Sequence, residues 1–259
     1  MLFEQERQQK ITNYVEKNGR ASVQELCKEF EVSESTIRRD LKVLEDNELI
    51  QRAHGGAIAK NGVNFEPTFS EKSDRFLEEK KAIAKKAVEF IHEGDTVLLD
   101  AGTTTRLLVD EMKALSIITV VTNSVVFANE LENYPKIEVV LLGGKLRTET
   151  LALVGPLTEL CLNQIHVDKG FIATNGIDLE VGLTTPNLTE AATKRKMIEQ
   201  SNQVIVMTDH SKFNRHSFAK FGTIEQIDYC ITDDKAPNEV LRALEQKGIK
   251  TIMSPLGGE

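Results

Sequence analysis

Apolar residues recur at helical spacing through the first part of the chain. Residues 4–18 place Ile11, Tyr14 and Val15 on one face, and Gly19 follows where helices commonly end. The predicted elements of this part are helices at residues 4–18, 23–30 and 34–47, a strand at 49–52, a glycine turn at 54–56 and a return strand at 57–59. Ser22 and Ser33 are the expected N-caps of the second and third helices.

From residue 76 onward, short β-branched runs alternate with amphipathic stretches. A helix is predicted at residues 78–93, where Gly94 ends it. Strands are predicted at residues 96–100, 117–122, 137–143, 169–174, 203–208, 228–232 and 249–253. Helices are predicted between them at residues 104–113, 124–133, 155–165, 188–200 and 236–247. Continuous apolar strands that alternate with helices indicate an α/β fold with a mostly parallel sheet, covered on both faces.

This change of pattern divides the chain into three segments. Residues 1–58 form a small unit of three helices and a hairpin, and residues 76–259 form the α/β domain. Residues 59–75 lack periodicity and contain Gly, Pro, Asn and Ser, so they are predicted to be a linker.

Composition narrows the class of protein. The chain has 259 residues, of which 40% are hydrophobic and 28% charged, as in ordinary globular proteins. No apolar run is long enough for a membrane helix, and the N-terminus carries charges where a signal peptide needs apolar residues. The three cysteines lie far apart, so they predict small buried side chains in a reducing cytoplasm. A net charge of −8 argues mildly against nucleic-acid binding, so any such function needs a local argument.

The third predicted helix supplies that local argument. Ile37 and Leu41 mark its buried side, and Ser35, Arg39 and Lys42 project from the opposite side. A cationic, hydroxylated helix that follows a second helix and a short turn is typical of a helix-turn-helix, whose recognition helix enters the major groove. The alternative is a solvated basic face, because residues 1–60 carry 10 Lys and Arg against 11 Asp and Glu. Arg38 lies on the flank of the same face.

The hairpin after this helix is predicted to be a wing. Arg52 supplies charge there, and His54, Gly55 and Gly56 allow the backbone to approach a sugar-phosphate chain.

The strongest feature of the α/β part follows the strand at residues 96–100. The buried strand ends in Asp100, and Gly102, Thr103, Thr104 and Thr105 open the next helix. Backbone N–H groups at a helix N-terminus, with hydroxyls beside them, form an anion cradle, and Asp100 can accept hydrogen bonds from sugar hydroxyls. The alternative is an ordinary capped turn.

Other strand ends carry compatible polar groups. Ligands of parallel α/β sheets gather at the carboxyl ends of strands, so we expect these groups to converge. They are Asn123, Gly144, Lys145, Asn175, Gly176, Asp209 and Lys212, the two lysines being candidate cations for a phosphate. No dinucleotide fingerprint and no P-loop occur, and the five histidines lack metal-binding spacing, so neither a cofactor nor a metal site is predicted.

Two stretches in the first unit carry a family resemblance. Residues 33–41 read Ser-Glu-Ser-Thr-Ile-Arg-Arg-Asp-Leu, and residues 52–56 read Arg-Ala-His-Gly-Gly. Both resemble the winged helix-turn-helix of the DeoR (GlpR-like) family of bacterial regulators. The resemblance implies operator binding through Ser35, Thr36, Arg38 and Arg39.

The resemblance continues through the α/β part in the stretches EKKAIAKKAVEFIHEGDTVLLDAGTTT, KGFIATNGID and DHSKF. They are similar to the sensor domain of that family, which shares the fold of ribose-5-phosphate isomerase and binds phosphorylated sugars. The resemblance implies phosphate at residues 102–105 and hydroxyl recognition by Asp100, with contributions from residues 143–145, 175–176 and Lys212. Glu190 and Lys194 lie near where an isomerase of this fold keeps active-site groups, but no intact catalytic motif is present.

The sequence therefore predicts a cytoplasmic repressor of a carbohydrate-use operon, controlled by a phosphorylated sugar. A palindromic operator needs at least two heads, so a dimer or tetramer of the chain is expected. The alternatives are an enzyme of the isomerase or phosphate-transfer class, and an interaction domain whose helical head binds protein. The identity of the sugar phosphate and the direction of its effect stay open.

Overall fold

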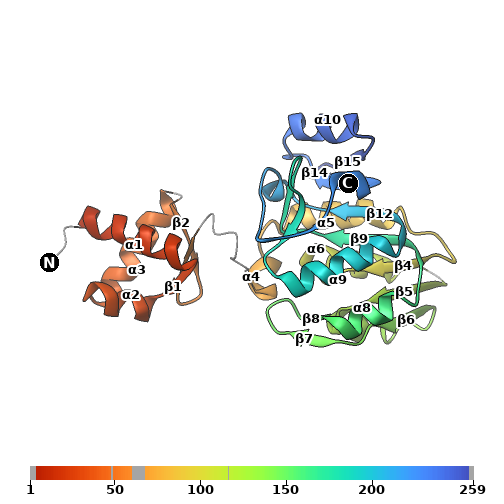
Figure 1. The fold of residues 1–259 in the computed structure, drawn as a ribbon, viewed down its shortest axis with the longest axis horizontal. Helices are drawn as coiled ribbons and strands as arrows, with labels where there is room; N and C mark the ends of the chain where they lie inside the picture. The colour runs from red at the N-terminus through yellow and green to blue at the C-terminus, as the bar shows by residue number, and fades with distance from the viewer. Residues whose placement is uncertain (1–3, 48, 60–67, 116, 257–259) are drawn as a thin grey trace. The chain divides into compact units, whose positions relative to one another are not determined.

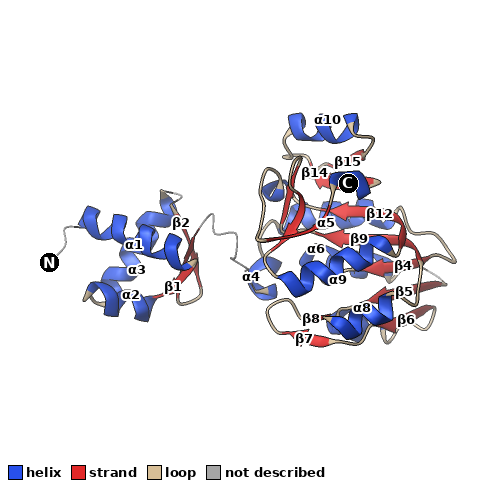
Figure 2. Ribbon diagram, viewed as in Figure 1, coloured by secondary structure: helices blue, strands red, loops and turns tan. Residues whose placement is uncertain are grey.

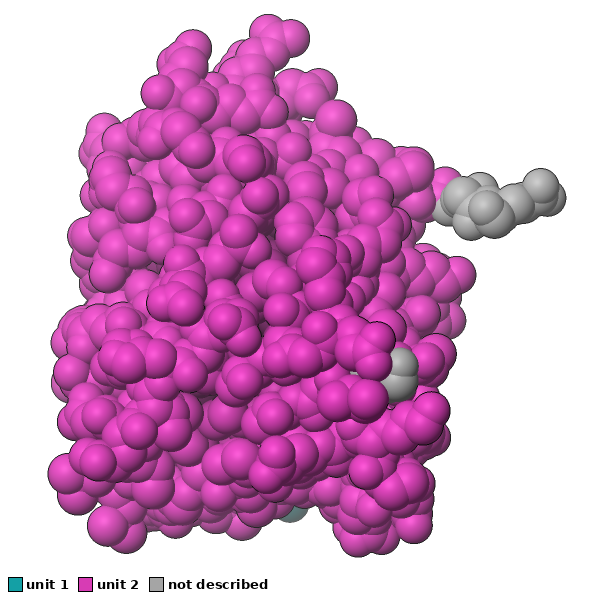
Figure 3. All heavy atoms as spheres, turned by 90° about the vertical axis from the view of Figure 1, so that its right-hand side faces the viewer, with its two compact units in different colours: residues 1–66 teal, residues 67–259 magenta. Residues whose placement is uncertain are grey.

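The computed structural model describes residues 4–47, 49–59, 68–115 and 117–256. The chain divides into two compact units, residues 1–66 and 67–259 (Figure 1). Figure 3 shows one face of the second unit in magenta.

Three helices and a three-stranded sheet make up the first unit. Its elements are α1 (Glu4–Asn18), β1 (Arg20–Ser22), α2 (Val23–Phe30), α3 (Glu34–Asp46), β2 (Ile50–Ala53) and β3 (Gly56–Ala59). The antiparallel sheet has the order β1-β3-β2, so the predicted hairpin gains a third strand that the sequence did not reveal. Ser22 and Glu25 form a capping box at the start of α2, and Ser33 caps α3, as expected. The fold is a winged helix-turn-helix.

A buried ion pair ties α1 to α3 inside this unit. Asp40 is 1% exposed, and its Oδ2 accepts a hydrogen bond from Arg7 Nε at 2.6 Å. Gln8 Nε2 donates to the same carboxylate at 3.2 Å. The acidic residue that follows Arg38 and Arg39 is therefore turned into the unit and does not oppose their charge on the surface.

A seven-stranded parallel sheet lies at the centre of the second unit (Figure 2). Its order is β15-β14-β12-β9-β4-β5-β6. The strands are β4 (Thr96–Leu99), β5 (Ile118–Thr122), β6 (Ile137–Leu141), β9 (Val167–Ala173), β12 (Ser201–Met207), β14 (Tyr229–Asp233) and β15 (Lys250–Ser254). Every strand predicted from the sequence is present, and all neighbouring pairs are parallel.

Helices cover both faces of this sheet, as predicted. Alternate residues of β4 show the division: Val97 and Leu99 belong to one hydrophobic cluster and Leu98 to the other. The first cluster takes in α5 (Leu77–Val88), α6 (Thr103–Met112) and α7 (Val125–Leu131). The second takes in α8 (Pro156–Leu162), α9 (Leu188–Glu199) and α10 (Asn238–Gln246). Among the described helices, none is long and apolar enough to cross a membrane.

Several short elements lie outside the predicted pattern. A hairpin of β7 (Lys145–Arg147) and β8 (Ala152–Val154) precedes α8, and β10 (Gly176–Asp178), β11 (Gly182–Thr185) and β13 (Ala219–Gly222) form a small separate sheet. Two 3-10 turns cover His210–Lys212 and Ile224–Gln226. The predicted linker contains α4 (Phe69–Ser73), whereas its residues 60–67 lie outside the described part of the chain.

The cysteines differ from expectation in one respect. Cys230 is buried and Cys27 is half-buried, but Cys161 is exposed on α8. The prediction of a buried side chain was wrong for Cys161, because it lies on the solvent side of that short helix.

Candidate functional site

The recognition helix α3 presents the side chains that its helical periodicity predicts. Ile37, Leu41 and Leu44 are at most 2% exposed, whereas Ser35, Arg39 and Lys42 are exposed. Arg39 and Lys42 have no ion-pair partner among the described residues, so their charges are available to an incoming polyanion. An arginine fork suits guanine acceptors, and a lysine suits phosphate.

Two other predicted DNA contacts are already engaged. Arg38 donates to Glu34 one turn earlier at 3.2 Å, and both side chains are 56% exposed. Thr36 is half-buried, and its hydroxyl lies 2.9 Å from the capping hydroxyl of Ser33. An exposed ion pair is weak, so Arg38 can still exchange Glu34 for a phosphate. The Thr36 hydroxyl is instead engaged with the N-cap residue at the start of α3.

The wing residues lie at the tip of the β2–β3 hairpin. His54 and Gly55 are exposed. Gly55 has a φ of 82°, a backbone conformation that residues other than glycine rarely adopt. Arg52 is also exposed and lies 3.7 Å from Glu45. The hairpin therefore combines an exposed glycine backbone at Gly55 with the cationic side chain of Arg52.

In the second unit, the N-terminus of α6 is open. Gly102 is the N-cap, and no side chain caps the first N–H groups. The Thr105 hydroxyl donates to the Asp100 carbonyl at 2.6 Å, which holds the turn in shape. The hydroxyls of Thr103 and Thr104 have no hydrogen-bond partner among the described residues. The capped-turn alternative accounts for Thr105 and leaves the other two hydroxyls free for an anion.

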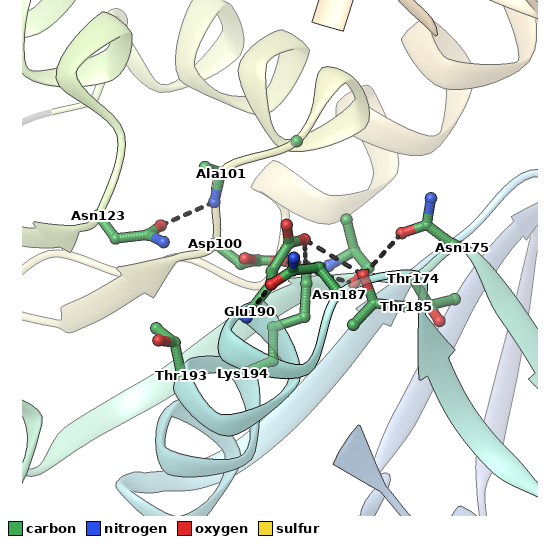
Figure 4. Close-up of polar contacts among 12 residues, drawn as sticks. Asp100, Ala101, Asn123, Thr174, Asn175, Thr185, Asn187, Glu190, Thr193 and Lys194 are labelled. Carbon is green, nitrogen blue, oxygen red and sulfur yellow. Dashed lines mark hydrogen bonds and ion pairs between the residues drawn. The ribbon is translucent and has the colours of Figure 1, made fainter. Parts of the chain in front are cut away.

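Behind this turn, two carboxylates (Asp100 and Glu190) and two cations (Lys194 and Arg147) form a network, of which Figure 4 labels Asp100, Glu190 and Lys194. Asp100 is 1% exposed and accepts hydrogen bonds from the Lys194 ammonium and from the Ala173 N–H at 3.1 Å. Lys194 also lies 3.8 Å from Glu190, which Arg147 contacts at 2.5 Å. Burial raises the pKa of Asp100, and the Lys194 ammonium opposes that rise. The two carboxylates and the two cations balance in charge, so the network holds these side chains in fixed positions near the strand end that precedes α6.

The predicted asparagines have structural partners of their own. The Asn123 side chain is 1% exposed, accepts from the Ala101 N–H at 3.0 Å and donates to the Leu153 carbonyl at 3.0 Å (Figure 4). Asn175 is half-buried and accepts from the Thr185 hydroxyl at 3.2 Å. Asn123 therefore positions the turn before α6, whereas Asn175 keeps its amide N–H groups for a ligand.

Glycines allow close packing at two of the predicted positions. A Cβ on Gly144 would lie 2.1 Å from the Thr158 hydroxyl, and one on Gly176 would lie 2.4 Å from the Arg215 carbonyl. Both glycines hold strand ends together, and neither needs a ligand to explain it. Lys145 is exposed on β7, and it is Arg147 of the same strand that reaches the buried network.

Cations gather beside the end of β12. Asp209 is buried and caps the turn that carries Lys212. Burial lowers the pKa of Lys212, Asp209 opposes this, and Arg75 and Arg215 lower it further. Burial likewise lowers the pKa of Lys80, on α5, to about 8. Among the described residues, Asp209 is the one carboxylate that acts to raise the pKa of Lys80 and of Lys212.

Three of these side chains were not predicted as site residues: Arg75, Lys80 and Arg147. A signal existed for Lys80, because Ile83, Ala84 and Ala87 share its helical face and are buried. Nothing comparable marks Arg147, which lies on an unpredicted three-residue strand. No cluster of three or more His, Cys, Asp or Glu that could hold a metal ion occurs among the described residues.

Comparison with known proteins identifies both units. Residues 7–62 match the model of the DeoR-like helix-turn-helix domain, and residues 75–234 match that of the DeoR C terminal sensor domain. The HTH-type transcriptional regulator GlpR of Haloferax volcanii is 41% identical over 247 residues, which cover 95% of this chain and 96% of that protein. The glycerol-3-phosphate regulon repressor of Escherichia coli K12 is 35% identical over 240 residues, with 93% and 95% covered.

Among solved structures, ribose 5-phosphate isomerase A from Methanocaldococcus jannaschii is similar at 18% identity. Its TM-score is 0.38, and the match covers 52% of this chain and 53% of that one.

A winged helix-turn-helix with an exposed cationic recognition helix, matched over its length to a regulator's DNA-binding domain, defines a DNA-binding transcriptional regulator. The chain belongs to the DeoR family, as the resemblance of its two sequence stretches predicted.

Proposed function

We propose that this regulator represses a carbohydrate-use operon and that a phosphorylated sugar bound in the second unit controls it. Relatives described as the glycerol-3-phosphate regulon repressor and the transcriptional repressor GlcR support the class of operon. The observations that carry the effector proposal are the open N-terminus of α6 and two buried or half-buried lysines, Lys80 and Lys212, that no described carboxylate binds directly.

The phosphate is proposed to bind at residues 103–105. Helix α5, which carries Lys80, packs against α6, and Lys80 is the first cation of the proposed site. A helix N-terminus favours anions, and two ammonium groups supply charge-assisted hydrogen bonds. Lys212 is the second cation of the proposed site.

The sugar end is proposed to face the polar groups beside α6. Asp100 is the proposed hydroxyl acceptor, although Lys194 already binds one of its oxygens. The free amide N–H groups of Asn175 are proposed to bind further hydroxyls, whereas both oxygens of Glu190 are engaged by Arg147 and Thr185. Gly144 and Gly176 are proposed to shape the site, and Lys145 is proposed to reach it from the surface. Asn123 and Asp209 act by holding the strand ends.

At the DNA end, α3 is proposed to enter the major groove. Arg39 reads base edges there, with Ser35, Thr36, Arg38 and Lys42 on the groove walls and backbone. Arg52, His54 and Gly55 contact the flanking sugar-phosphate chain from the wing. A palindromic operator then requires at least two copies of the chain, acting as a dimer or larger assembly in the cytoplasm.

The experiment is fluorescence anisotropy on a labelled fragment of the gene's own upstream region. Protein is titrated onto the fragment, and then triose, pentose and hexose phosphates are added beside their unphosphorylated sugars. We expect a salt-sensitive complex that one phosphorylated sugar alters and its parent sugar does not. Tight binding that no member of the panel changes would contradict the effector assignment and leave the DNA-binding assignment intact.

The same panel tests catalysis. We propose that the second unit senses its ligand without converting it, so no sugar phosphate should be isomerised. Turnover at a rate abolished by Asp100→Ala would overturn this part of the proposal.

A further inference from the structure

Apolar side chains are exposed along one side of helix α8. Leu157 is 63% exposed and Leu160 is 59% exposed, and Cys161 beside them is exposed as well. Residues three and four apart share a face of a helix, so these three side chains lie together. Thr158 and Leu162, on the other side of the helix, are fully buried. The helix therefore packs one side into the second unit and leaves an apolar side in water.

Helix α9 extends this surface. Leu188, its first residue, is 64% exposed. The Gly155 N–H, immediately before α8, donates to the Thr193 hydroxyl of α9 at 3.3 Å, and a Cβ on Gly155 would lie 3.6 Å from the Thr189 side chain. Leu188 precedes Thr189 directly, and Leu157 is two residues from Gly155. The two helices lie side by side on one face of the sheet (Figures 1 and 2).

The edge strand β6 contributes a further apolar side chain, Val140, which is 39% exposed. Its partner in the parallel ladder is Val121, which belongs to the same hydrophobic cluster as Leu162 of α8. Paired residues of neighbouring strands point to the same face of a sheet, so Val140 points to the face that α8 covers.

We call this set of uncharged side chains the α8 face; its members are Val140, Leu157, Leu160, Cys161 and Leu188.

The α8 face is large for a surface that stays in water. Its four aliphatic side chains leave on the order of 300 Å² of apolar surface exposed, a size at which patches on a monomer are often functional. A standard interface between subunits buries about 800 Å² from each of them and has an apolar core within a polar rim. The α8 face therefore has the size of the core of such an interface.

A second copy of the chain fits this face best. A winged helix-turn-helix that reads a palindromic operator acts in pairs. Among the described residues of the first unit, Leu49 is the one large apolar side chain that is exposed, so that unit offers little surface for association. Between described residues, the longest stretch of chain is 60–67, which is too short to cover two helices and a strand. Each chain carries a net charge of −8, so two copies repel overall and approach most easily at an uncharged face.

We propose that two copies of the chain associate through the α8 face around a two-fold axis, with α8 of one copy against α8 of the other. The proposal rests on the assembly of at least two copies proposed above and names its surface. A two-fold interface uses the same patch on both copies, so an apolar, uncharged face is complementary to itself. Leu157 and Leu160 form the core of the contact, and the two Cys161 thiols come close to each other across the axis.

The α8 face adjoins the elements of the proposed effector site. The Thr158 hydroxyl of α8 donates at 2.6 Å to the Gly143 carbonyl, just before the strand that carries Arg147. Leu188 lies on the same helix as Glu190 and Lys194. A ligand that moves these elements would therefore change how the two copies are held together.

The first test is sedimentation velocity of the full-length protein. We expect the wild type to form a dimer or a larger even assembly and Leu160→Glu to halve its mass at micromolar concentration. Two like charges buried at one interface should raise the dissociation constant by about 100-fold or more. Met253→Glu is the matched control, because Met253 is 51% exposed on β15, at the edge of the sheet opposite to β6. It should sediment as the wild type, and circular dichroism should show both variants to be folded.

The second test uses a native cysteine. A short bismaleimide should join two copies at Cys161 and give a covalent dimer, since Cys27 is half-buried and Cys230 is buried. Cys161→Ser should remove this product. An assembly whose mass Leu160→Glu leaves unchanged, or one that gives no Cys161 product, would overturn the α8 face and leave the proposed assembly standing. A wild type that is monomeric at every concentration would overturn both.

Discussion

The two units use charge in opposite ways. On α3, Arg39 and Lys42 are exposed and unpaired within the described residues. Around Asp100, the charged groups are buried or half-buried, and each is neutralised by a partner that is 2–12% exposed. A DNA-binding surface needs mobile, solvated cations that can exchange water and salt for phosphates. A small-molecule site needs groups whose positions are fixed before the ligand arrives. The contrast teaches that the position of an exposed charge can be assigned from helical spacing. The position of a buried charge can be assigned only when the location of its partner is known.

The most severe test of this contrast is to break the buried ion pair between Lys194 and Asp100. Lys194→Met leaves the Asp100 carboxylate buried without its cation, which should lower the unfolding free energy of the second unit by about 3–5 kcal/mol. Urea denaturation followed by circular dichroism measures this. Lys196→Met, which removes an exposed ion pair with Glu199 on the same helix, should cost less than about 0.5 kcal/mol. Equal losses for the two variants would mean that the Asp100 network is not a buried, coupled unit.

On the DNA side, the expected effect is on binding and not on stability. Arg39→Ala should weaken operator binding by about 1–3 kcal/mol and leave effector affinity unchanged. Anisotropy titrations at a fixed salt concentration measure the loss. Lys28→Ala, an exposed position on α2, is the control for a general loss of charge. Equal operator affinity for Arg39→Ala and the wild type would remove Arg39 from the recognition surface.

Acidity should distinguish the two regions as well. The pKa of Lys80 is lowered to about 8, so its ammonium is lost as the pH rises through that value. Phosphate is mostly a dianion from pH 8 upward, so its affinity should fall above pH 8 by up to about tenfold per pH unit as the Lys80 ammonium is lost. Isothermal titration at pH 7, 8 and 9 measures this. Lys80→Met should bind weakly at every pH, with a flatter profile. Operator binding depends on Arg39 and should change little between pH 7 and 9.

The smallest expected effect comes from a single hydroxyl. Thr104→Ala removes one uncharged donor from the start of α6, which should weaken phosphate binding by about 0.5–1.5 kcal/mol. Lys212→Ala should weaken it more, because a charged group is lost. In both variants the operator complex should form normally and respond less to the effector. A normal effector response in both would place the phosphate elsewhere.

Much of the fold could be predicted because its signals are local. The seven strands of the main sheet are continuous apolar runs, and the caps of α2 and α3 are single residues followed by helical spacing. The strands β7, β8 and β10 are three residues long, which is too short for an alternating pattern of apolar and polar residues to reveal them.

The candidate site was predicted less completely for the same reason. The threonines of α6 come shortly after the end of β4, so their place in the sequence is enough to predict that they lie at the carboxyl end of that strand. In the sequence, only the apolar face of its helix marks Lys80 and only the family resemblance marks Lys194, yet both are at most 4% exposed in the structure. Only the fold shows that Lys194 meets Asp100, a residue 94 positions away. Buried charges of this kind require the partner's location, which a local pattern does not contain.

The core of the first unit has a consequence for engineering. Its buried cluster runs from Ile11 to Ala57, and every described member lies in the winged helix-turn-helix itself. Replacing residues 1–59 by the matching segment of another DeoR-family protein would therefore exchange the whole of this buried cluster. Such a chimera would test whether operator choice can be varied independently of the second unit, as an interchangeable module of a genetic circuit.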